Sequence, residues 1–472
     1  MVINIRIILT SLVFVFAICG KLLGQPSNAI YADKQTNDGT AAGLGLTGSY
    51  SVTGADNVRS TLASPKPNNS FATLTATSTA GISTAWIQLE FPSEVISSVG
   101  SPRTVYLRTS NNNSTLLGGR LAVTAYDKNN NSVGVVSSAF STYYLPDGTV
   151  FIAISPTATF KFVRVTVSSP IAFGSNSLQV YYGFYGPSAS NTSNPYPFNV
   201  VDCGQPNVTT KGYSGLTLGT FEIYNAWEAI DESLTSKSSF ISSGAALLGG
   251  HIKQTFFFNG VSNPSDAVRL ILSQSGSFLS ANVAASITLQ AYNGNSSVGT
   301  SVLINNLLDV QLLNLLGGND SVITFYFAPK DGSGNSVVFD RVELDLNIAG
   351  LGVGLGANGI NVHDVRRSPG IANASDASAC SNIGTVSLSA LSSQINISGI
   401  GSFTYAWYTD IRLGTQLSAQ QSWTAQGLNT PGQVTYYVET QKSGAGCIAS
   451  PRKKVTITVT APPLSPSVAL VP

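Results

Sequence analysis

"VTAYDKNNNSVG" at Val123–Gly134 and "LQAYNGNSSVG" at Leu289–Gly299 are two versions of one pattern. In each, a short alternating run leads into a turn rich in Asn. Asn tolerates positive φ angles and hydrogen-bonds its own backbone, and both properties suit a hairpin turn. The sequence therefore predicts that the chain forms the same hairpin twice.

The strand-like runs around this hairpin also recur, and their order is the same in both copies. The matched pairs are Trp86–Phe91 with His251–Phe258, Thr104–Ser110 with Ala267–Ser273, Phe162–Val167 with Phe339–Leu344, Ser177–Tyr182 with Gly359–Asp364, and Asn57–Phe71 with Asn225–Phe240. The conserved order predicts two units of one fold. We expect Tyr126 to superpose on Tyr292 and Arg164 on Arg341, and the shared arginine indicates a structural contact more than a site.

The composition indicates an all-β protein. Val, Ile, Tyr and Phe alternate with Ser, Thr and Asn, and Gly- and Asn-rich turns separate the runs. Each repeat offers about eight such runs, which predicts two jelly-roll β-sandwiches. The 472 residues carry a net charge of +1, which provides no electrostatic footprint for nucleic acid. We therefore expect no nucleic-acid partner.

The N-terminus has the pattern of a secretory signal peptide. Arg6 precedes an apolar stretch, Ile7–Cys19, which is too short to span a bilayer at about 20 residues. Lipidation at Cys19 is the alternative, but Ile18 stands where a lipoprotein signal needs a small residue. We expect cleavage after Gly24, no transmembrane segment in the mature chain, and a secreted, extracellular protein.

The pattern changes after the second repeat, where a span of about 90 residues has the size of an immunoglobulin-like (Ig-like) sandwich. Its frame is Cys380, Trp407 and Cys447. The predicted layout is a signal peptide at 1–24, an N-terminal leader at 25–45, repeat 1 at 46–186, a linker at 187–205, repeat 2 at 206–368, the Ig-like domain at 369–460 and a Pro-rich linker at 461–472.

This third domain resembles the Ig-like module of type IX-secreted bacterial surface proteins. The matching positions are Cys380, Val386, Leu388, Trp407, Tyr408, Thr435, Tyr436, Tyr437, Val438, Gly446, Cys447, Arg452 and Val455. The stretch Asp410–Leu417 departs from the family at a loop that tends to contain a Gly-Gly turn. The two repeats are more loosely similar to galactose-binding-like jelly rolls of the same proteins. The resemblance implies a modular protein at the cell surface, where such modules are spacers or binders.

Removal of the signal peptide leaves three cysteines, Cys203, Cys380 and Cys447. Three is odd, so one is unpaired or pairs outside this chain. The Cys–Trp–Cys frame of an exported Ig-like domain predicts a Cys380–Cys447 disulfide. The state of Cys203 stays open.

One acidic stretch is a candidate metal site. "AIDESLTS" at Ala229–Ser236 resembles the loop that holds Ca²⁺ at the rim of some galactose-binding-like domains, with Asp231 and Glu232 as oxygen ligands. The matching stretch of repeat 1 has no carboxylate, which favours an ordinary polar loop. We therefore predict no metal and no cofactor, and keep Ca²⁺ at Asp231 and Glu232 as the alternative.

The sequence offers no catalytic constellation. The chain has two histidines, and its 23 acidic residues are scattered. His363 and Asp364 are neighbours on an expected strand, so their side chains point to opposite faces. Six aromatic residues could stack on sugars, although core packing is the favoured interpretation for each: Tyr143, Tyr144, Tyr181, Tyr182, Tyr185 and Trp227. We predict no catalytic residues and assign no binding residue.

These observations predict a secreted, non-catalytic cell-surface protein that acts in adhesion or ligand binding, with an extracellular glycan or surface polymer as its partner. A purely structural spacer is the first alternative. The second is an accessory, non-catalytic part of a polysaccharide-degrading enzyme whose catalytic domain lies beyond Pro472. The oligomeric state is left open.

Overall fold

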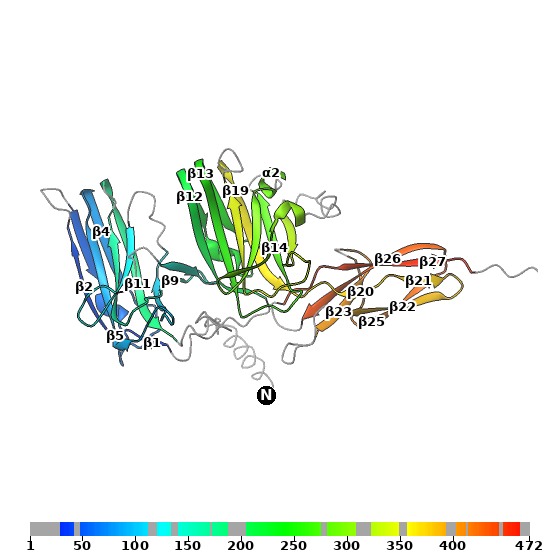
Figure 1. The fold of residues 1–472 in the computed structure, drawn as a ribbon, viewed down its shortest axis with the longest axis horizontal. Coiled ribbons are helices and arrows are strands. Elements are labelled where there is room, and N and C mark those ends of the chain that lie inside the picture. The colour runs from blue at the N-terminus through cyan, green and yellow to red at the C-terminus, as the bar shows by residue number, and fades with distance from the viewer. Residues whose placement is uncertain are drawn as a thin grey trace, which may run out of the picture. The chain divides into compact units, whose positions relative to one another are not determined.

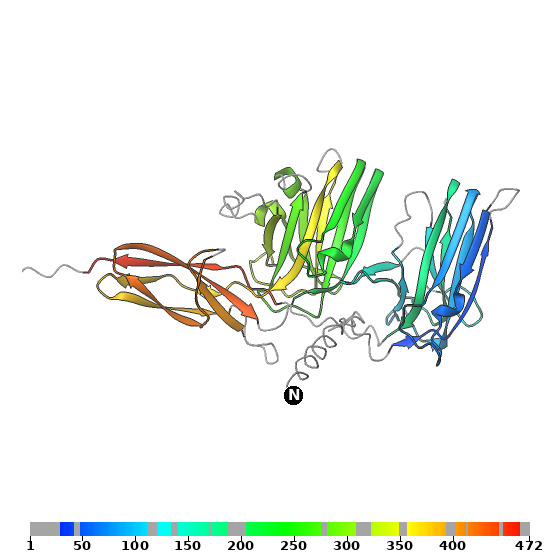
Figure 2. The ribbon, with the colours of Figure 1, turned by 180° about the vertical axis from the view of Figure 1, so that it is seen from behind.

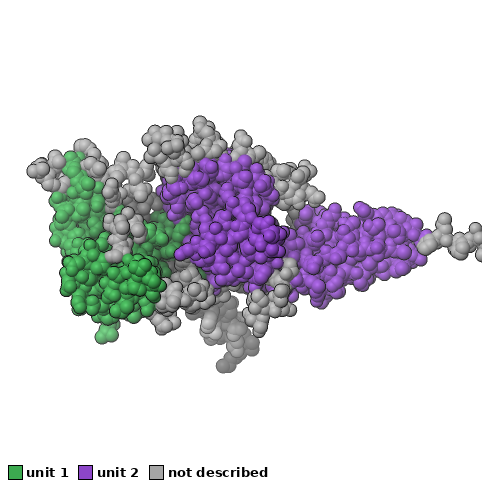
Figure 3. Space-filling model, viewed as in Figure 1, with its two compact units in different colours: residues 1–201, 207–210 green, residues 202–206, 211–472 purple. Residues whose placement is uncertain are grey.

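The computed structural model confirms an all-β protein (Figure 1). It describes residues 29–41, 48–111, 120–133, 140–169, 172–186, 204–274, 281–307, 322–348, 356–392, 403–411, 414–442 and 447–462. The predicted signal peptide, Cys203 and most of the two predicted linkers lie outside these residues. Two compact units are coloured in Figure 3: unit 1 is residues 1–201 and 207–210, and unit 2 is residues 202–206 and 211–472. No helix in the described ranges has the length and apolar character needed to cross a membrane.

Unit 1 is a sandwich of two sheets, seen from opposite sides in Figures 1 and 2. The first sheet has the strand order β3 (Gly48–Thr53), β4 (Ala72–Ala80), β11 (Ala172–Tyr185), β6 (Val105–Thr109), β9 (Val150–Ile154) and β8 (Ser141–Tyr144), and β1 (Ile30–Tyr31) also pairs with β11. The second sheet has the order β2 (Lys34–Thr40), β5 (Thr84–Val95), β10 (Phe160–Ser168) and β7 (Arg120–Tyr126).

The alternation of β10 shows why these residues form a sandwich. Val163, Val165 and Val167 are 0% exposed and face the core, whereas Arg164 and Thr166 between them are half-buried on the outer side. Burying one such valine contributes about 1.5–3 kcal/mol. A slip of one residue would move all three valines into water, so the core fixes which side chains face outward.

Unit 2 contains a related sandwich, in which β12 (Pro206–Tyr224) runs beside the long strand β13 (Ser238–Phe258). One layer joins the start of β13 to β19 (Gly356–Ser368), β14 (Ala267–Gln274) and β17 (Val322–Phe327). The other joins the end of β13 to β18 (Arg341–Asn347), β15 (Ile287–Asn293) and β16 (Ser296–Leu303). A single strand thus serves both layers, whereas unit 1 uses two, β4 and β5.

The described helical elements are single turns. They are η2 (Ala55–Val58), η4 (Ala226–Ala229), α2 (Ala281–Ala284) and η5 (Ile304–Leu307).

The two sandwiches share their strand order, but one expected superposition is wrong. Tyr126 and Tyr292 lie on the corresponding strands β7 and β15, and the two arginines lie on β10 and β18. However, Tyr126 pairs with Phe162, whereas Tyr292 pairs with Arg341. Superposing the tyrosines therefore places Arg341 on Phe162, two residues before Arg164. A shift of two residues keeps the same face of the sheet, which is why the sequence pattern did not reveal it.

The repeated Asn-rich stretches both form hairpins, with different turns. Residues 289–299 form the β15–β16 hairpin, closed by Asn293 opposite Ser296. The loop after Tyr126 is longer, and Asp127 Oδ1 accepts hydrogen bonds from the backbone N–H groups of Asn129 and Asn131 at 2.9 and 2.8 Å. Unit 2 has a loop with the same hydrogen bonds at a different place in the chain, between β17 and β18. There Asp331 Oδ1 accepts from the backbone N–H groups of Ser333 and Asn335 at 2.9 and 2.8 Å. In both loops hydrogen bonds from an asparagine lower the pKa of the aspartate.

The C-terminal part of unit 2 is an Ig-like sandwich. Its sheets are β20–β22–β25 and β21–β27–β26–β23–β24. Trp407 is 0% exposed at the centre of the core, and its Nε1–H donates to the carbonyl of Gln420 at 3.1 Å. The strands are β20 (Asn373–Ala374), β21 (Ala377–Cys380), β22 (Gly384–Leu391), β23 (Phe403–Tyr408), β24 (Gln416–Ser418), β25 (Ser422–Leu428), β26 (Gly432–Lys442) and β27 (Lys453–Thr460).

The expected Cys380–Cys447 disulfide is wrong. Cys380 is a free thiol that lies opposite Thr460, at the end of β27. Cys447 lies in the connection from β26 to β27, before β27 begins at Lys453. The length of β27, about 23 Å, therefore separates the two cysteines, whereas a disulfide needs Cα atoms within about 7 Å. Cys447 is disulfide-bonded to a partner outside the described residues.

We expect iodoacetamide to label Cys380 in the native, unreduced protein and to label Cys447 only after reduction. Peptide mass spectrometry of both samples measures this difference. The Cys380→Ser variant is the matched control and should unfold at the same temperature as the parent. A cross-linked peptide that joins Cys380 to Cys447 would contradict the structure.

Candidate functional site

The outer face of the β2–β5–β10–β7 sheet carries a cluster of aromatic, cationic and amide side chains. Gln88 on β5 lies directly opposite Arg164 on β10. Trp86 on β5 and Tyr126 on β7 each lie two residues from the position that pairs with Arg164. Because residues two apart on a strand share a face, all four point away from the core. Asn130, in the loop after β7, completes the group. We call these five residues the outer-face cluster.

The Arg164 side chain lies between the two aromatic rings. Its Cζ is 4.0 Å from the centroid of the Trp86 ring and 4.6 Å from that of Tyr126. Both contacts are within the range of cation–π attraction, which contributes about 0.5–1 kcal/mol each at exposed sites. The Arg164 Nε–H donates to Gln88 Oε1 at 2.9 Å. Two rings and one hydrogen bond therefore fix the plane of the guanidinium.

The amides link the cluster into one network. Gln88 is only 6% exposed, and its Nε2 donates to Oδ1 of Asn130 at 3.2 Å. Asn130 is exposed and has a φ of 65°, a left-handed conformation that Asn tolerates well. The rings of Trp86 and Tyr126 are half-buried, so part of each contacts solvent. The site therefore presents two partly exposed rings on a fixed framework.

The described lysines around this face are paired, and Asp38, opposite Trp86, accepts hydrogen bonds from the Tyr50 hydroxyl and the Gly39 backbone N–H. Lys34 Nζ and Lys161 Nζ lie 3.6 and 3.5 Å from Oε1 of Glu90. At the edge, Lys128 pairs with Glu94 at 3.8 Å. Arg164 forms no ion pair with any carboxylate of the described residues. It is therefore the cation of this face whose charge is not matched.

The corresponding face of unit 2 has a different character, because its charges neutralise one another. Lys253 Nζ lies 2.8 Å from Glu343 and 3.2 Å from Asp345, and His251 Nδ1 lies 2.8 Å from Asp345. Burial tends to lower the pKa of Lys253, but the hydrogen bond and charge of Glu343 and the charge of Asp345 raise it overall. This face holds a closed set of ion pairs.

The acidic loop of unit 2 satisfies its own carboxylate. Asp231 Oδ1 accepts from the Ser233 backbone N–H at 2.9 Å, and Oδ2 accepts from the Ser236 hydroxyl at 2.7 Å. Glu232 has a φ of 69°. Among the described residues, no group of three His, Cys, Asp or Glu side chains converges as a metal site would require. Calcium binding at Asp231 and Glu232 stays a question for experiment.

The matching loop of unit 1 is held by a lysine. Lys66 is 7% exposed, and its Nζ donates to the carbonyls of Asn57 and Ser70 and, at 2.6 Å, to Asn68 Oδ1. Burial, together with the charge of Arg108, lowers the pKa of Lys66 to about 8, so the ammonium still predominates at pH 7. The sequence does not single out Lys66, because a lysine between prolines in a polar loop usually has a solvated side chain.

The two residues His363 and Asp364 do not act together. His363 Nε2 lies 2.8 Å from Ser273 Oγ, and burial lowers the pKa of the imidazole. Asp364 is 1% exposed and bonds Arg269 at 2.6 Å and Arg366 at 3.0 Å. The prediction that these neighbours point to opposite faces of a strand is not confirmed, because a bulge at His363 breaks the alternation of β19 and both residues bond side chains on the same face of β14, Ser273 and Arg269. Ser273 is 5% exposed, so its hydroxyl is closed to a substrate.

The aromatic residues singled out from the sequence are largely structural. Tyr144, Tyr182 and Tyr185 are less than 9% exposed. Tyr181 is half-buried beneath Arg108, whose Cζ lies 4.5 Å from its ring. None of the six belongs to the outer-face cluster. Its rings come from Trp86 and Tyr126, and their shared arginine could be found only once three strands were placed side by side.

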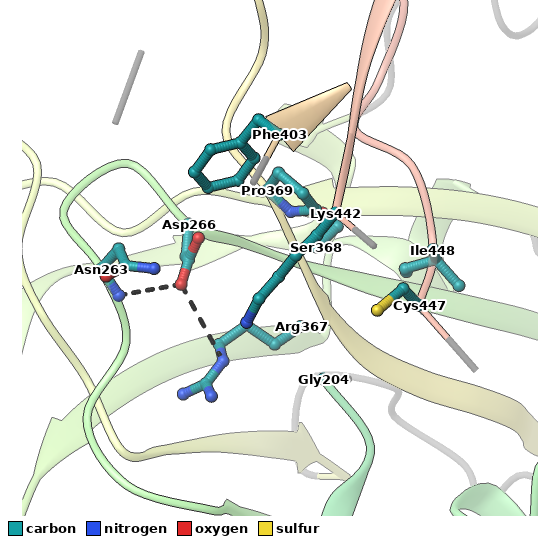
Figure 4. A pocket seen from close by; sticks show the side chains of 10 residues that line it. All are labelled: Gly204, Asn263, Asp266, Arg367, Ser368, Pro369, Phe403, Lys442, Cys447 and Ile448. Atoms are coloured by element: carbon teal, nitrogen blue, oxygen red, sulfur yellow. Dashed lines mark hydrogen bonds and ion pairs between the residues drawn. The ribbon is translucent and has the colours of Figure 1, made fainter. Parts of the chain in front are cut away.

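Unit 2 contains a small polar pocket, shown in Figure 4. Asp266 Oδ2 accepts a hydrogen bond from the Asn263 backbone N–H at 2.8 Å and lies 3.9 Å from Arg367 Nε. The Arg367 backbone N–H donates to the carbonyl of Gly204 at 2.7 Å. These groups satisfy one another, which indicates a structural role. The other lining residues are Ser368, Pro369, Phe403, Lys442, Cys447 and Ile448.

The C-terminal domain matches a known protein family. Residues 369–461, about a fifth of the chain, match the model described as "Ig-like domain CHU_C associated". The predicted Ig-like fold is therefore confirmed for this part of the chain. A search of curated proteins gives no match.

Comparison with solved structures gives only distant similarities. A β-1,2-glucanase from Parabacteroides distasonis is 12% identical with a TM-score of 0.24, over 56% of this chain and 38% of the glucanase. The CBM22-1–CBM22-2 tandem of Xyn10C from Paenibacillus barcinonensis is 10% identical with a TM-score of 0.17, over 73% of this chain and 99% of the tandem. Immunoglobulin domains 1–4 of Sidekick-1 are 11% identical with a TM-score of 0.15, over 55% of this chain and 70% of theirs. Scores this low carry no argument about function.

We expect Lys66→Met to destabilise unit 1 by about 2 kcal/mol, because three oxygen acceptors lose a charged donor. For a unit of this size, this lowers the unfolding temperature by about 4–8 °C. Differential scanning calorimetry of the full chain measures the shift. Lys34→Met is the matched control, because Lys34 has a side-chain exposure of 68%. Equal behaviour of the two variants would contradict a structural role for Lys66.

We also expect the unfolding temperature to be the same in CaCl₂ and in EDTA, because both oxygens of Asp231 already accept hydrogen bonds from their own loop. Calorimetry in both buffers measures this. A Ca²⁺-dependent rise that disappears in Asp231→Asn would show that the loop binds the ion.

Proposed function

We propose that this protein is a non-catalytic extracellular binding protein, and that the outer-face cluster of unit 1 binds a glycan. The observation that carries the proposal is the half-exposed ladder of Trp86, Arg164 and Tyr126, backed by Gln88. Nothing in the core requires this arrangement, because the inward residues of β10 supply the packing.

The chemistry of the cluster suits a sugar chain. Aromatic rings pack against the apolar C–H faces of pyranose rings, and amide and guanidinium groups bond the hydroxyls at the ring edge. A sheet face is flat and continuous, so an extended polymer can lie across neighbouring strands. The fixed guanidinium and the buried Gln88 lose little conformational entropy on binding.

The remaining parts support a modular surface protein. The Ig-like domain resembles modules of exported proteins, and the N-terminus has a signal-like pattern. The closed ion pairs on unit 2 favour a spacer role for that unit. The Ser273 hydroxyl that His363 bonds is buried, which supports a non-catalytic role for this serine.

We expect Trp86→Ala to weaken binding to a recognised polysaccharide by at least tenfold, or about 1.4 kcal/mol, because the stacking surface is lost. Affinity electrophoresis of the full chain in gels that contain neutral and acidic polysaccharides measures retardation. Tyr224→Ala is the matched control, since Tyr224 is a 37% exposed aromatic residue of unit 2.

Two results would overturn the proposal. One is the absence of retardation by every polysaccharide at high concentration, which would leave the spacer role. The other is steady release of reducing ends from any of them by the purified chain.

A further inference from the structure

The charge on Arg164 is the feature of the outer-face cluster that neutral sugars do not explain. The other described cations of this face, Lys34 and Lys161, share Glu90. Arg164 instead has aromatic rings on both sides and an amide at Nε. An arginine needed only as a spacer between rings would gain from an ion pair with a carboxylate, and Arg164 forms none with the described residues, although Glu90 lies on the same face.

The hydrogen bonds of Arg164 leave one edge of the guanidinium available. Gln88 takes the Nε–H, and the two rings cover the faces of the plane. The Nη1 and Nη2 groups have no hydrogen-bond partner among the described residues. Two parallel N–H groups on one edge match the two oxygens of a carboxylate, and this paired geometry is stronger than a single neutral hydrogen bond.

Unit 2 provides an internal comparison. Arg341, on the strand that corresponds to β10, donates from Nε to Asp340 Oδ1 at 2.8 Å and from Nη2 to Asp340 Oδ2 at 3.3 Å. It also lies over an aromatic ring, 4.8 Å from the centroid of Phe257. The arginine of unit 2 therefore has the carboxylate that Arg164 lacks.

We infer that the outer-face cluster recognises an acidic polysaccharide, and that Arg164 binds the carboxylate of a uronic acid residue. The inference rests on the proposed glycan-binding function and names its ligand class. Trp86 and Tyr126 pack against the sugar rings, and the Nη edge of Arg164 receives the carboxylate between them.

The test compares polygalacturonate and alginate with their esters, highly methyl-esterified pectin and propylene glycol alginate. Esterification keeps the backbone and removes the charge. We expect the full chain to bind at least one free acid at least tenfold more tightly than its ester, and NaCl to weaken this binding. This comparison needs no variant, so it does not depend on how a substitution folds.

Variants then assign the preference to one residue. Arg164→Gln should lose the preference for the acid and keep ester binding, and Arg164→Lys should restore only part of it, because Lys keeps the charge without the planar fork. Arg341→Gln is the matched control and should bind like the parent. Calorimetry confirms that each variant is folded.

The outcomes separate the inference from the proposed function. Equal binding of acids and esters that still depends on Trp86 keeps the glycan-binding function and overturns the role of Arg164. An acid preference that survives in Arg164→Gln also overturns that role. Absence of binding to all acidic and neutral polymers overturns both.

Discussion

The burial of alternate valines on β10 is the constraint on which the rest of unit 1 depends. Because Val163, Val165 and Val167 must face the core, Arg164 must face outward. The neighbouring strands β5 and β7 bury their own alternate residues in the same core. This pairing places Trp86 and Tyr126 on either side of the arginine. The outer-face cluster is thus positioned by residues that do not belong to it. Truncation of one of these valines to alanine would remove two buried methyl groups and loosen the support beneath the cluster.

The sequence was sufficient to predict the sheets, the repeated hairpins and the Ig-like domain, because alternation and turn chemistry are local. It was insufficient wherever the outcome depended on which strands pair and in which register. The Cys380–Trp407–Cys447 spacing does not say at which end of a sheet each cysteine lies, and the two cysteines lie at opposite ends. Similarly, no local pattern joins Trp86 to Tyr126, which meet only through a third strand. The repeat itself was visible, but a two-residue register difference between the copies was not.

The two sandwiches share their strand order but differ in the side chains on their outer faces. Both keep an outward arginine near a tyrosine. In unit 2 a carboxylate pairs with that arginine, whereas in unit 1 the described carboxylates of the face do not pair with Arg164. A face whose charges are already paired costs desolvation energy to open, whereas an unmatched guanidinium gains from an incoming anion. The same fold therefore occurs twice in one chain, once with the outward arginine ion-paired and once with it unpaired. The difference lies in a few outward positions that the core does not constrain.

The parallel pairing of β21 with β27 in the Ig-like domain has a mechanical consequence. Ala377–Cys380, near the start of the domain, runs beside Ile457–Thr460 at its end, with the two strands pointing the same way. Tension applied to the chain on both sides of the domain would pull these strands past each other. The backbone hydrogen bonds between the two strands would then bear the force together and would have to break at the same time. In a hairpin pulled from its ends, by contrast, they break one after another. The Ig-like domain can therefore carry tension along the chain without unravelling strand by strand.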